Sequence, residues 1–588
     1  MYGPTKKAVD DSLMAYRPES MLFSRKHRIA TIMRSPATTK RLLLLLWAAF
    51  IIRGLWYSAA MPIWEGYDEP YHFAYLQHLA AGGLSPGTAV VSLEVQHSLH
   101  LLPLAWELYL QHPPPPLITY DSFWQLPATD RELLISGIRR LSPGEGNEPA
   151  TEGIPNYEFQ QMPLYYWFFS IPMGLMGRTS LLSRVIALRI LSVLLASIAV
   201  PLAFKVARQV LGEEGKALGV TALLVLLPEL MVNLARVGNE SLALVLMTLA
   251  LVYALKTVEQ PERWSAWIAL GLALGLGLLT KAYFLVTLPA LMLIALYLIW
   301  TSLSSHGWKR QTIRVTLRAC AAVGIILAVA GRWYWHVHVR TGSWSGQADD
   351  AALHNIALAQ KLIAVPSVNW KSGAISILLS HIWFGGWSFL RLPVGWYLLA
   401  AVPIAVGVSG VGVRWMRERA GAEPDSQRPQ VLVLGALYLC FWVGLAYHVL
   451  ITFMNTGVSA STGWYLYCLV VAELVLLVWG LEAFFRTKVL LLALCLGVAV
   501  MDLYGMHALM LPYYVGLSAH MGKQVPTALA LTLSHLPTVF ARLAINKPDW
   551  LSTPVLVILW FLYLGATVGG LLICAISKEL GRLEDRIG

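Results

Sequence analysis

The sequence predicts an all-α polytopic membrane protein, a bundle of about 12 (roughly 11 to 14) transmembrane helices with a large first extracytoplasmic loop. Of its 588 residues, 57% are apolar and only 13% are charged, which is too few polar side chains to cover a soluble globule. Apolar runs of roughly 18 or more residues recur along the chain, and each can cross a hydrocarbon layer of about 30 Å. No strand-type alternation competes with these runs.

The N-terminal region has the charge pattern of a cytoplasmic anchor. Nine Lys and Arg residues precede Leu42 among three acids, so the net charge of +11 indicates contact with a bilayer and not with nucleic acid. The run 42–61 is too long and too far from the start for a signal peptide, and we expect a retained first helix. All five cysteines fall in apolar runs, which implies neither a disulfide framework nor a zinc site.

The organisation follows from these runs. We expect a cytoplasmic N-terminus at 1–41, a first helix at 42–61 and an extracytoplasmic loop with surface helices at 62–161. The remaining parts are a transmembrane region at 162–336, a second extracytoplasmic loop at 337–393, C-terminal transmembrane helices at 394–576 and a cytoplasmic tail at 577–588. This topology predicts a multi-pass protein of the plasma (inner) membrane.

The segment 163–177 is apolar but short, so we expect a re-entrant or surface helix there. The later helices are expected at 184–207, 217–236, 241–256, 265–280, 282–300, 313–335, 394–413, 431–453, 464–485, 489–510 and 552–576. With this count four basic connectors fall on the cytoplasmic side, in agreement with the positive-inside bias. The stretch 372–390 is either a half-helix in the second loop or a further crossing.

Polar residues gather at the outer ends of several expected helices, in 62–79, 156–168, 235–244 and 278–284. Asp68 follows the first helix directly, at the depth where a lipid phosphate meets water. Its carboxylate has the chemistry of a general base, and together with His72, one helical turn on, it has the spacing of a metal site. The competing reading is that Asp68 caps a surface helix, with Glu69 favoured by the helix dipole.

Lys281 interrupts two apolar helices at a tight external turn. A cation there suits the phosphate of a leaving group, and the alternative is a lysine that contacts only headgroups. Asn239 and Glu240 begin a helix beside Arg236, where ordinary capping is the competing reading. Arg53 lies inside the first helix, and we expect a structural role for it within the bundle.

These residues form ordered motifs that resemble a known superfamily. "DEPYH" at 68–72, "YEFQQMPLYY" at 157–166, "RVGNESLA" at 236–243 and the lysine-containing turn in 271–291 follow one another with the spacing of the C-type (GT-C) membrane glycosyltransferases. That superfamily includes protein O-mannosyltransferases and lipid A aminoarabinose transferases, and the likeness covers about 42–300. The chain departs from the pattern at Gln160, where His is usual, at Met162, where Pro is usual, and at Trp464, where an Arg is frequent.

The resemblance implies a GT-C-like bundle and an inverting glycosyltransferase. Its donor would be a polyprenyl-phosphate sugar, such as an undecaprenyl-phosphate sugar, and its acceptor a hydroxyl of a glycan, lipid or protein at the extracytoplasmic face. Asp68 would be the base or acceptor-orienting group and Glu69 its support. The residues implied in donor or acceptor binding are His72, Tyr157, Glu158, Gln161, Tyr165, Arg236, Asn239, Glu240 and Lys281.

Metal use stays open at this stage. Some relatives hold a divalent cation at the first acidic residue and others do not, so Mg²⁺ or Mn²⁺ at Asp68, His72 and Glu240 is one alternative. Two other functions fit the composition: a transporter or flippase of lipid-linked glycans, and a non-catalytic GT-C-like subunit. Transporters usually carry their ionisable residues near the midplane, whereas the polar groups here cluster at one face.

Overall fold

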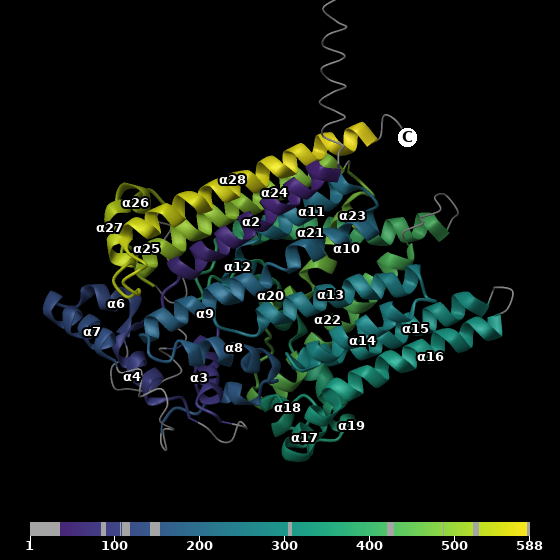
Figure 1. Ribbon diagram of the computed structural model, residues 1–588, viewed down its shortest axis with the longest axis horizontal. Coiled ribbons are helices and arrows are strands. Elements are labelled where there is room, and N and C mark those ends of the chain that lie inside the picture. Colours follow the sequence, from purple (N-terminus) through teal and green to yellow (C-terminus); the bar gives the residue numbers. More distant parts are fainter. Residues whose placement is uncertain are drawn as a thin grey trace, which may run out of the picture.

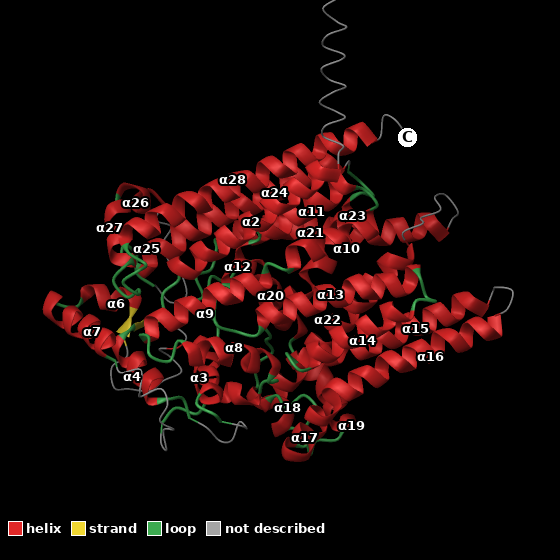
Figure 2. Cartoon of the chain, in the orientation of Figure 1, coloured by secondary structure: helices red, strands yellow, loops and turns green. Residues whose placement is uncertain are grey.

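The protein is described here by a computed structural model that covers residues 36–83, 90–105, 108, 118–141, 153–303, 308–419, 428–485, 487–520 and 529–584. Within these ranges nearly all regular structure is helical (Figure 2). Most of the expected N-terminal anchor, the basic residue Arg486 and the last residues of the tail lie outside the described residues.

The first half of the chain begins with one long helix, continues with short helices of the first loop and returns to the bundle (Figure 1). Its elements are α2 Pro36–Ala60, α3 Glu69–Ala80, α4 Leu93–Leu101, β1 Pro103–Leu104, β2 Ile118–Thr119, α6 Tyr120–Gln125, α7 Ala128–Arg140, η2 Tyr157–Gln160, α8 Leu164–Leu175, α9 Leu181–Ala196, α10 Ala199–Leu211, α11 Glu214–Leu226, α12 Pro228–Leu234, α13 Glu240–Glu259, α14 Trp264–Leu278, η3 Ala282–Val286 and α15 Thr287–Leu303.

The second half contains the second large loop and the C-terminal helices. Its elements are α16 Trp308–Ile326, η4 Leu327–Gly331, α17 Arg332–Thr341, α18 Ala348–Ala352, α19 Leu358–Ala364, η5 Val365–Ser367, α20 Trp370–Ile382, α21 Val394–Arg419, α22 Arg428–Thr456, η6 Gly463–Leu469, α23 Val470–Leu481, α24 Thr487–Tyr504, η7 Gly505–Met510, α25 Leu511–Tyr514, α26 Leu529–Ser534, α27 Leu536–Leu543 and α28 Thr553–Glu584. The parallel pair β1–β2 makes the one sheet of the described chain.

The described residues hold ten helices long and apolar enough to cross a membrane, or twelve if two sharply bent pairs are counted as spans. This confirms the predicted all-helical membrane fold. The expected short segment at 163–177 is α8, whose 12 residues span about 18 Å at 1.5 Å per residue, less than a hydrocarbon layer. The stretch 372–390 begins within α20, which meets the preceding helix at 86°.

A break between α11 and α12 shapes the region that carries the candidate residues. Pro228 lacks the amide that would continue α11, and the two helices bend by 60°. The chain then runs through 235–239 before α13 begins at Glu240. The helix break therefore places Arg236 and Glu240 at one end of the bundle, beside α3.

Candidate active site

A cavity of about 710 Å³ lies where the first loop meets the bundle. The predicted residues Asp68, His72, Tyr157, Glu158, Gln161, Glu240 and Lys281 line one part of it. Residues of 342–361 and of α22 also line it, and Leu285 and Val286 of η3 with Phe441 and Leu445 of α22 add apolar surface. Segments far apart in the sequence thus share one chamber, as expected for the four polar stretches.

Asp68 is held in an unusual backbone conformation. Its φ of 57° is left-handed, and its side chain makes no capping hydrogen bond to α3. Its carboxylate accepts a hydrogen bond from the Tyr157 hydroxyl and faces the cavity. Burial raises the pKa of Asp68, while Tyr157 and the nearby Arg236 and Lys281 oppose that rise. The side-chain cap reading of Asp68 is therefore wrong.

Glu158 and His72 stand next to Asp68. His72 Nδ1 lies 2.6 Å from the Tyr166 hydroxyl and 3.4 Å from Glu158 Oε2. Burial, with the charge of Arg236 also contributing, lowers the pKa of His72 well below its usual value, so the ring is neutral at pH 7. Burial and the neighbouring Asp68 raise the pKa of Glu158.

These three residues have the geometry of a metal-ligand group. One ligand atom from each of Asp68, His72 and Glu158 lies within 4.8 Å of the other two. Glu158 Oε2 is buried and receives no hydrogen bond from the described chain, so it has a lone pair to offer a cation. The donor set of two carboxylates and a neutral imidazole fits a divalent cation. Glu158 holds the place in this group that was expected for Glu240.

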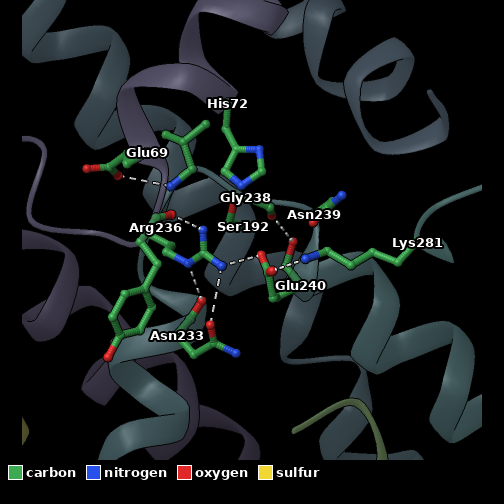
Figure 3. A network of polar contacts seen from close by, with 12 residues as sticks. Glu69, His72, Ser192, Asn233, Arg236, Gly238, Asn239, Glu240 and Lys281 are labelled. Atoms are coloured by element: carbon green, nitrogen blue, oxygen red, sulfur yellow. Dashed lines mark hydrogen bonds and ion pairs between the residues drawn. The ribbon is translucent and has the colours of Figure 1, made fainter. Parts of the chain in front are cut away.

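Glu240 is engaged by two cations. Lys281 donates to its Oε1, and Arg236 Nη2 lies 2.6 Å from its Oε2 (Figure 3). The Lys281 side chain is only 8% exposed, so it does not reach out to headgroups as the alternative reading required. It also lies 5.6 Å from the ring centre of Tyr283 and 5.8 Å from that of Tyr465. The result is a buried, net positive trio beside Asp68.

Glu69 does not line the cavity. Its carboxylate accepts hydrogen bonds from Arg189 Nε at 2.7 Å and Nη2 at 2.5 Å, and from the backbone amides of Trp64 and Val237. Arg189 also donates to the carbonyl oxygen of Met61 at 2.8 Å. This fully buried pair ties the first loop to α9 and to the start of the α13 region. Arg189 was not predicted, although an arginine inside an apolar run is a signal of such a role.

The remaining predicted residues form the scaffold of the site. The Tyr165 hydroxyl contacts Ser192 at 3.1 Å and accepts a hydrogen bond from the Gly238 amide at 3.1 Å. Asn239 Nδ2 donates to Gln161 Oε1 at 3.3 Å and to the Thr280 carbonyl at 3.2 Å. No side-chain cap is made by Asn239. Its amide links 156–168, 235–244 and 278–284.

The second loop and α22 add polar residues to the cavity lining that were not predicted. Asp350 accepts hydrogen bonds from Ser343, from Ser345 at 2.7 Å and from the Tyr447 hydroxyl at 2.7 Å. Lys361 Nζ lies 3.1 Å from the same hydroxyl. These contacts fasten the second loop to α22. Tyr447 is 97 residues from Asp350 and 86 from Lys361, so no local spacing pointed to these two contacts.

Trp464, at the position where an Arg is frequent in the superfamily, also lines the cavity. Its ring stacks on Tyr67 with centres 4.0 Å apart and planes 14° from parallel. The position thus supplies an aromatic wall and no cation, and Lys281 and Lys361 are the lysines that line the cavity among the described residues.

Comparison with known proteins agrees with the motifs. Residues 160–335 match the family of dolichyl-phosphate-mannose-protein mannosyltransferases. Two Pseudomonas undecaprenyl phosphate-α-4-amino-4-deoxy-L-arabinose arabinosyl transferases are each 26% identical: the P. fluorescens protein over 279 residues (45% of each chain) and the P. paraeruginosa protein over 288 residues (45% of this chain and 50% of the relative). The chain thus matches about half the length of these relatives.

Two solved structures are also similar. ArnT from Cupriavidus metallidurans, bound to undecaprenyl phosphate, has 14% identity and a TM-score of 0.44, covering 93% of this chain and 79% of ArnT. The apo oligosaccharyltransferase of Archaeoglobus fulgidus has 12% identity and a TM-score of 0.38, covering 88% and 57%. The family match and the curated relatives confirm the resemblance seen in the motifs: this chain is related to the GT-C membrane glycosyltransferases.

Proposed function

We propose that this protein is an inverting glycosyltransferase that moves a sugar from a polyprenyl-phosphate donor to an acceptor hydroxyl at the extracytoplasmic membrane face. The observation that carries this proposal is one cavity in which a carboxylate, Asp68, faces a buried Lys281–Glu240–Arg236 trio, with an apolar wall between η3 and α22. The family match supports a lipid-phosphate sugar donor.

Asp68 is the proposed general base. The acceptor oxygen attacks the anomeric carbon, and its proton passes to the Asp68 carboxylate as the bond from that carbon to the phosphate oxygen breaks. Tyr157 holds the carboxylate by a hydrogen bond, and the left-handed backbone fixes its direction. Attack opposite the leaving group inverts the anomeric carbon.

Lys281 is the proposed partner of the leaving phosphate. Release of polyprenyl phosphate adds negative charge, which a buried ammonium stabilises more strongly than an exposed one can. Glu240 holds the lysine in place by an ion pair with one carboxylate oxygen. Arg236 pairs with the other oxygen and so fixes Glu240. Three charges with a net positive sum are thus ready before the donor arrives.

The apolar wall is the proposed site of the isoprenoid tail next to the phosphate. Leu285, Val286, Phe441 and Leu445 line the cavity at the junction of η3 with α22. An apolar lining of this kind suits a hydrocarbon tail, because apolar side chains make contacts that do not depend on direction. The donor's phosphate would then lie at Lys281.

A divalent cation fits the group formed by Asp68, His72 and Glu158. Such an ion would supply a Lewis acid that neutralises charge on a phosphate or acceptor oxygen. His72 would hold it through a neutral ring nitrogen, and Glu158 would use its free buried oxygen.

The test is transfer by the purified protein. With a panel of radiolabelled polyprenyl-phosphate sugars and membrane extract, the parent should release free polyprenyl phosphate and label a product. Asp68→Asn should lose at least about 10²-fold in rate, as for loss of a catalytic acid or base, with an unchanged melting temperature. Asp549→Asn is the matched control, since Asp549 is an exposed carboxylate far from the cavity in sequence and outside its lining.

The rival functions give different results in the same assay. A flippase would move the donor across a vesicle membrane without cleaving it, and a non-catalytic subunit would leave every donor intact. Intact donors across the panel, with Asp68→Asn equal to the parent, would refute the proposed activity.

A further inference from the structure

The second extracytoplasmic loop contacts α12 and the part of the first loop that precedes Asp68 in the sequence. Phe384 and Gly385 donate their backbone amides to Glu229 Oε2 at 2.8 and 3.0 Å. Ser388 donates its amide and its hydroxyl to Glu65 at 3.1 and 2.9 Å. We name residues 384–389 the clamp loop, because its amides donate hydrogen bonds to two buried carboxyl groups, those of Glu65 and Glu229.

The clamp loop reaches Asp68 through Tyr67. The Tyr67 hydroxyl donates to Glu229 Oε1 at 2.7 Å and accepts from the Gly386 amide at 3.3 Å. The Tyr67 carbonyl accepts a hydrogen bond from Arg236, which also pairs with Glu240. The residue that precedes Asp68 is therefore fixed at its ring, its hydroxyl and its carbonyl.

Backbone strain is concentrated at this contact. The three non-glycine residues with positive φ in the described chain are Trp64 at 67°, Asp68 at 57° and Phe389 at 51°. Two of them bracket the segment 64–68, and the third lies in the clamp loop. Such conformations persist only where the surroundings hold them, and they are frequent at functional sites.

The contact is also sterically exact at one glycine. Gly386 has a φ of 82°, and a Cβ atom there would lie 2.6 Å from Glu65 Oε1. The hydrogen bonds from the clamp-loop amides therefore require a residue without a side chain at position 386. Glu65, Tyr67 and Glu229 are each fully buried, so the contact is closed to water.

We propose that the clamp loop is a positioning element of the reaction centre, which uses Glu65, Tyr67 and Glu229 to hold segment 64–68 in the strained backbone that aims Asp68 into the cavity. This inference rests on the proposed function. Glu65, Glu229 and the clamp loop are positioning groups and touch no reacting atom. The apolar wall proposed for the lipid tail, at η3 and α22, is built from other segments. The clamp loop reaches the Glu240–Lys281 pair through Tyr67 and Arg236.

The test combines kinetics with hydrogen exchange on the full-length protein. Gly386→Ala should lower kcat by about 10²-fold, as for a misplaced catalytic group, and leave KM for the lipid donor within about twofold. Backbone amides in 62–72 should exchange faster at the same time. Gly395→Ala is the matched control, because nothing lies within 4 Å of a Cβ at Gly395. Ser388→Ala, which removes a single hydroxyl bond to Glu65, is a milder second variant and should give a smaller effect of the same kind.

Two outcomes overturn the proposal. Faster exchange in 62–72 with parental kcat would mean that the clamp does not position Asp68, and parental exchange in both variants would mean that it does not hold the segment. Glu65→Gln keeps the side-chain shape and an acceptor oxygen, so this variant should retain more transfer activity than Glu65→Ala. A parent without transfer activity would refute the proposed function alone, since the exchange measurements would still show whether the clamp holds 64–68.

Discussion

Lys281 is the residue through which the charge of the site is most directly tested. Lys281→Met removes the ammonium and leaves Glu240 paired with Arg236. We expect kcat/KM to fall by about 10²- to 10³-fold, the usual cost of losing one charge-stabilising group. Inhibition by free polyprenyl phosphate should weaken in parallel, because the same phosphate is contacted. Lys281→Arg should recover part of the activity and part of the inhibition. If free polyprenyl phosphate inhibited the Lys281→Met variant as strongly as the parent, the phosphate would bind elsewhere.

Glu65 gives the protein a predicted dependence of stability on pH. Burial raises its pKa from 4.5 to about 8 in the folded state, and hydrogen bonds from Ser388 only partly oppose this. Between these two values the folded protein binds one proton more than the unfolded chain. The contribution of protonated Glu65 to the free energy of unfolding is therefore complete below about pH 4.5 and is lost as pH rises through 8. Melting temperatures of the parent should fall over that window more steeply than those of Glu65→Gln. Parallel curves would contradict the prediction.

The site residues that could be identified from the sequence are each marked by their immediate neighbours in the chain. Asp68, Glu240 and Lys281 each stand at the end of an apolar run, where a charge is costly unless it has a function or a partner. Glu69 and Arg189 form a pair across 120 residues, and nothing in either local sequence reveals the other. Asp350 and Tyr447 are related in the same way. Tertiary partners of this kind could not be predicted from one sequence.

At the scale of elements, hydropathy predicted helices but not their breaks. The expected single helices at 184–207 and 217–236 are α9 with α10 and α11 with α12, and the second pair is bent at Pro228. A proline inside an apolar run signals a break without fixing its angle, which depends on packing against other helices. That angle, and not the helix itself, brings Arg236 to the site.

The junction of η3 and α22 carries the prediction for the lipid. A Cβ at Gly444 would lie 2.5 Å from Val286 Cγ1, so Gly444→Leu should narrow the apolar part of the cavity. We expect KM for a long-chain donor to rise by about tenfold or more, while a short-chain soluble donor analogue is used nearly as before. Gly435→Ala on the same helix is the control, since nothing lies within 4 Å of a Cβ there. An equal loss with both donors would argue against a tail at this wall.

At the scale of the whole molecule, a buried polar network joins four helices. Arg53 Nη1 lies 2.8 Å from Asp502 Oδ2, and Arg53 also donates to the last carbonyls of α11, those of Val225 and Leu226, at 2.9 Å. The Tyr57 and Tyr563 hydroxyls each donate a hydrogen bond to the Asp502 carboxylate. The structural role expected for Arg53 is thus specific: it holds the end of α11 beside the break that leads to the site.

Removing both charges of this pair should cost less than the sum of removing each one alone. Arg53→Leu leaves Asp502 buried without its partner, and we expect a loss of about 3–5 kcal/mol in the free energy of unfolding. The double variant Arg53→Leu with Asp502→Leu should lose less than the sum of the two single variants, because they share one interaction. Thermal unfolding in detergent measures this cycle, and strict additivity would show that the pair is not coupled.

The orientation of the bundle decides on which side of the membrane the reaction centre lies. A hydrogen bond and two ion pairs join several helix ends at the other end of the bundle from Asp68. Thr39 donates to Glu214 at 2.6 Å, and Lys216 and Arg414 lie 2.8 and 3.2 Å from Glu482. The positive-inside bias assigns this basic face to the cytoplasm, so the cavity should open on the other side.

Cysteine labelling of intact cells tests that orientation. Asn355 and Arg417 are both exposed and lie on opposite sides in the proposed topology. In a Cys320→Ser background, which removes the exposed native thiol, Asn355→Cys should react with a membrane-impermeant maleimide before permeabilisation, and Arg417→Cys only after it. The reverse pattern would turn Asp68 and Lys281 toward the cytoplasm. Transfer at the extracytoplasmic face would then be impossible, whatever donor the cavity binds.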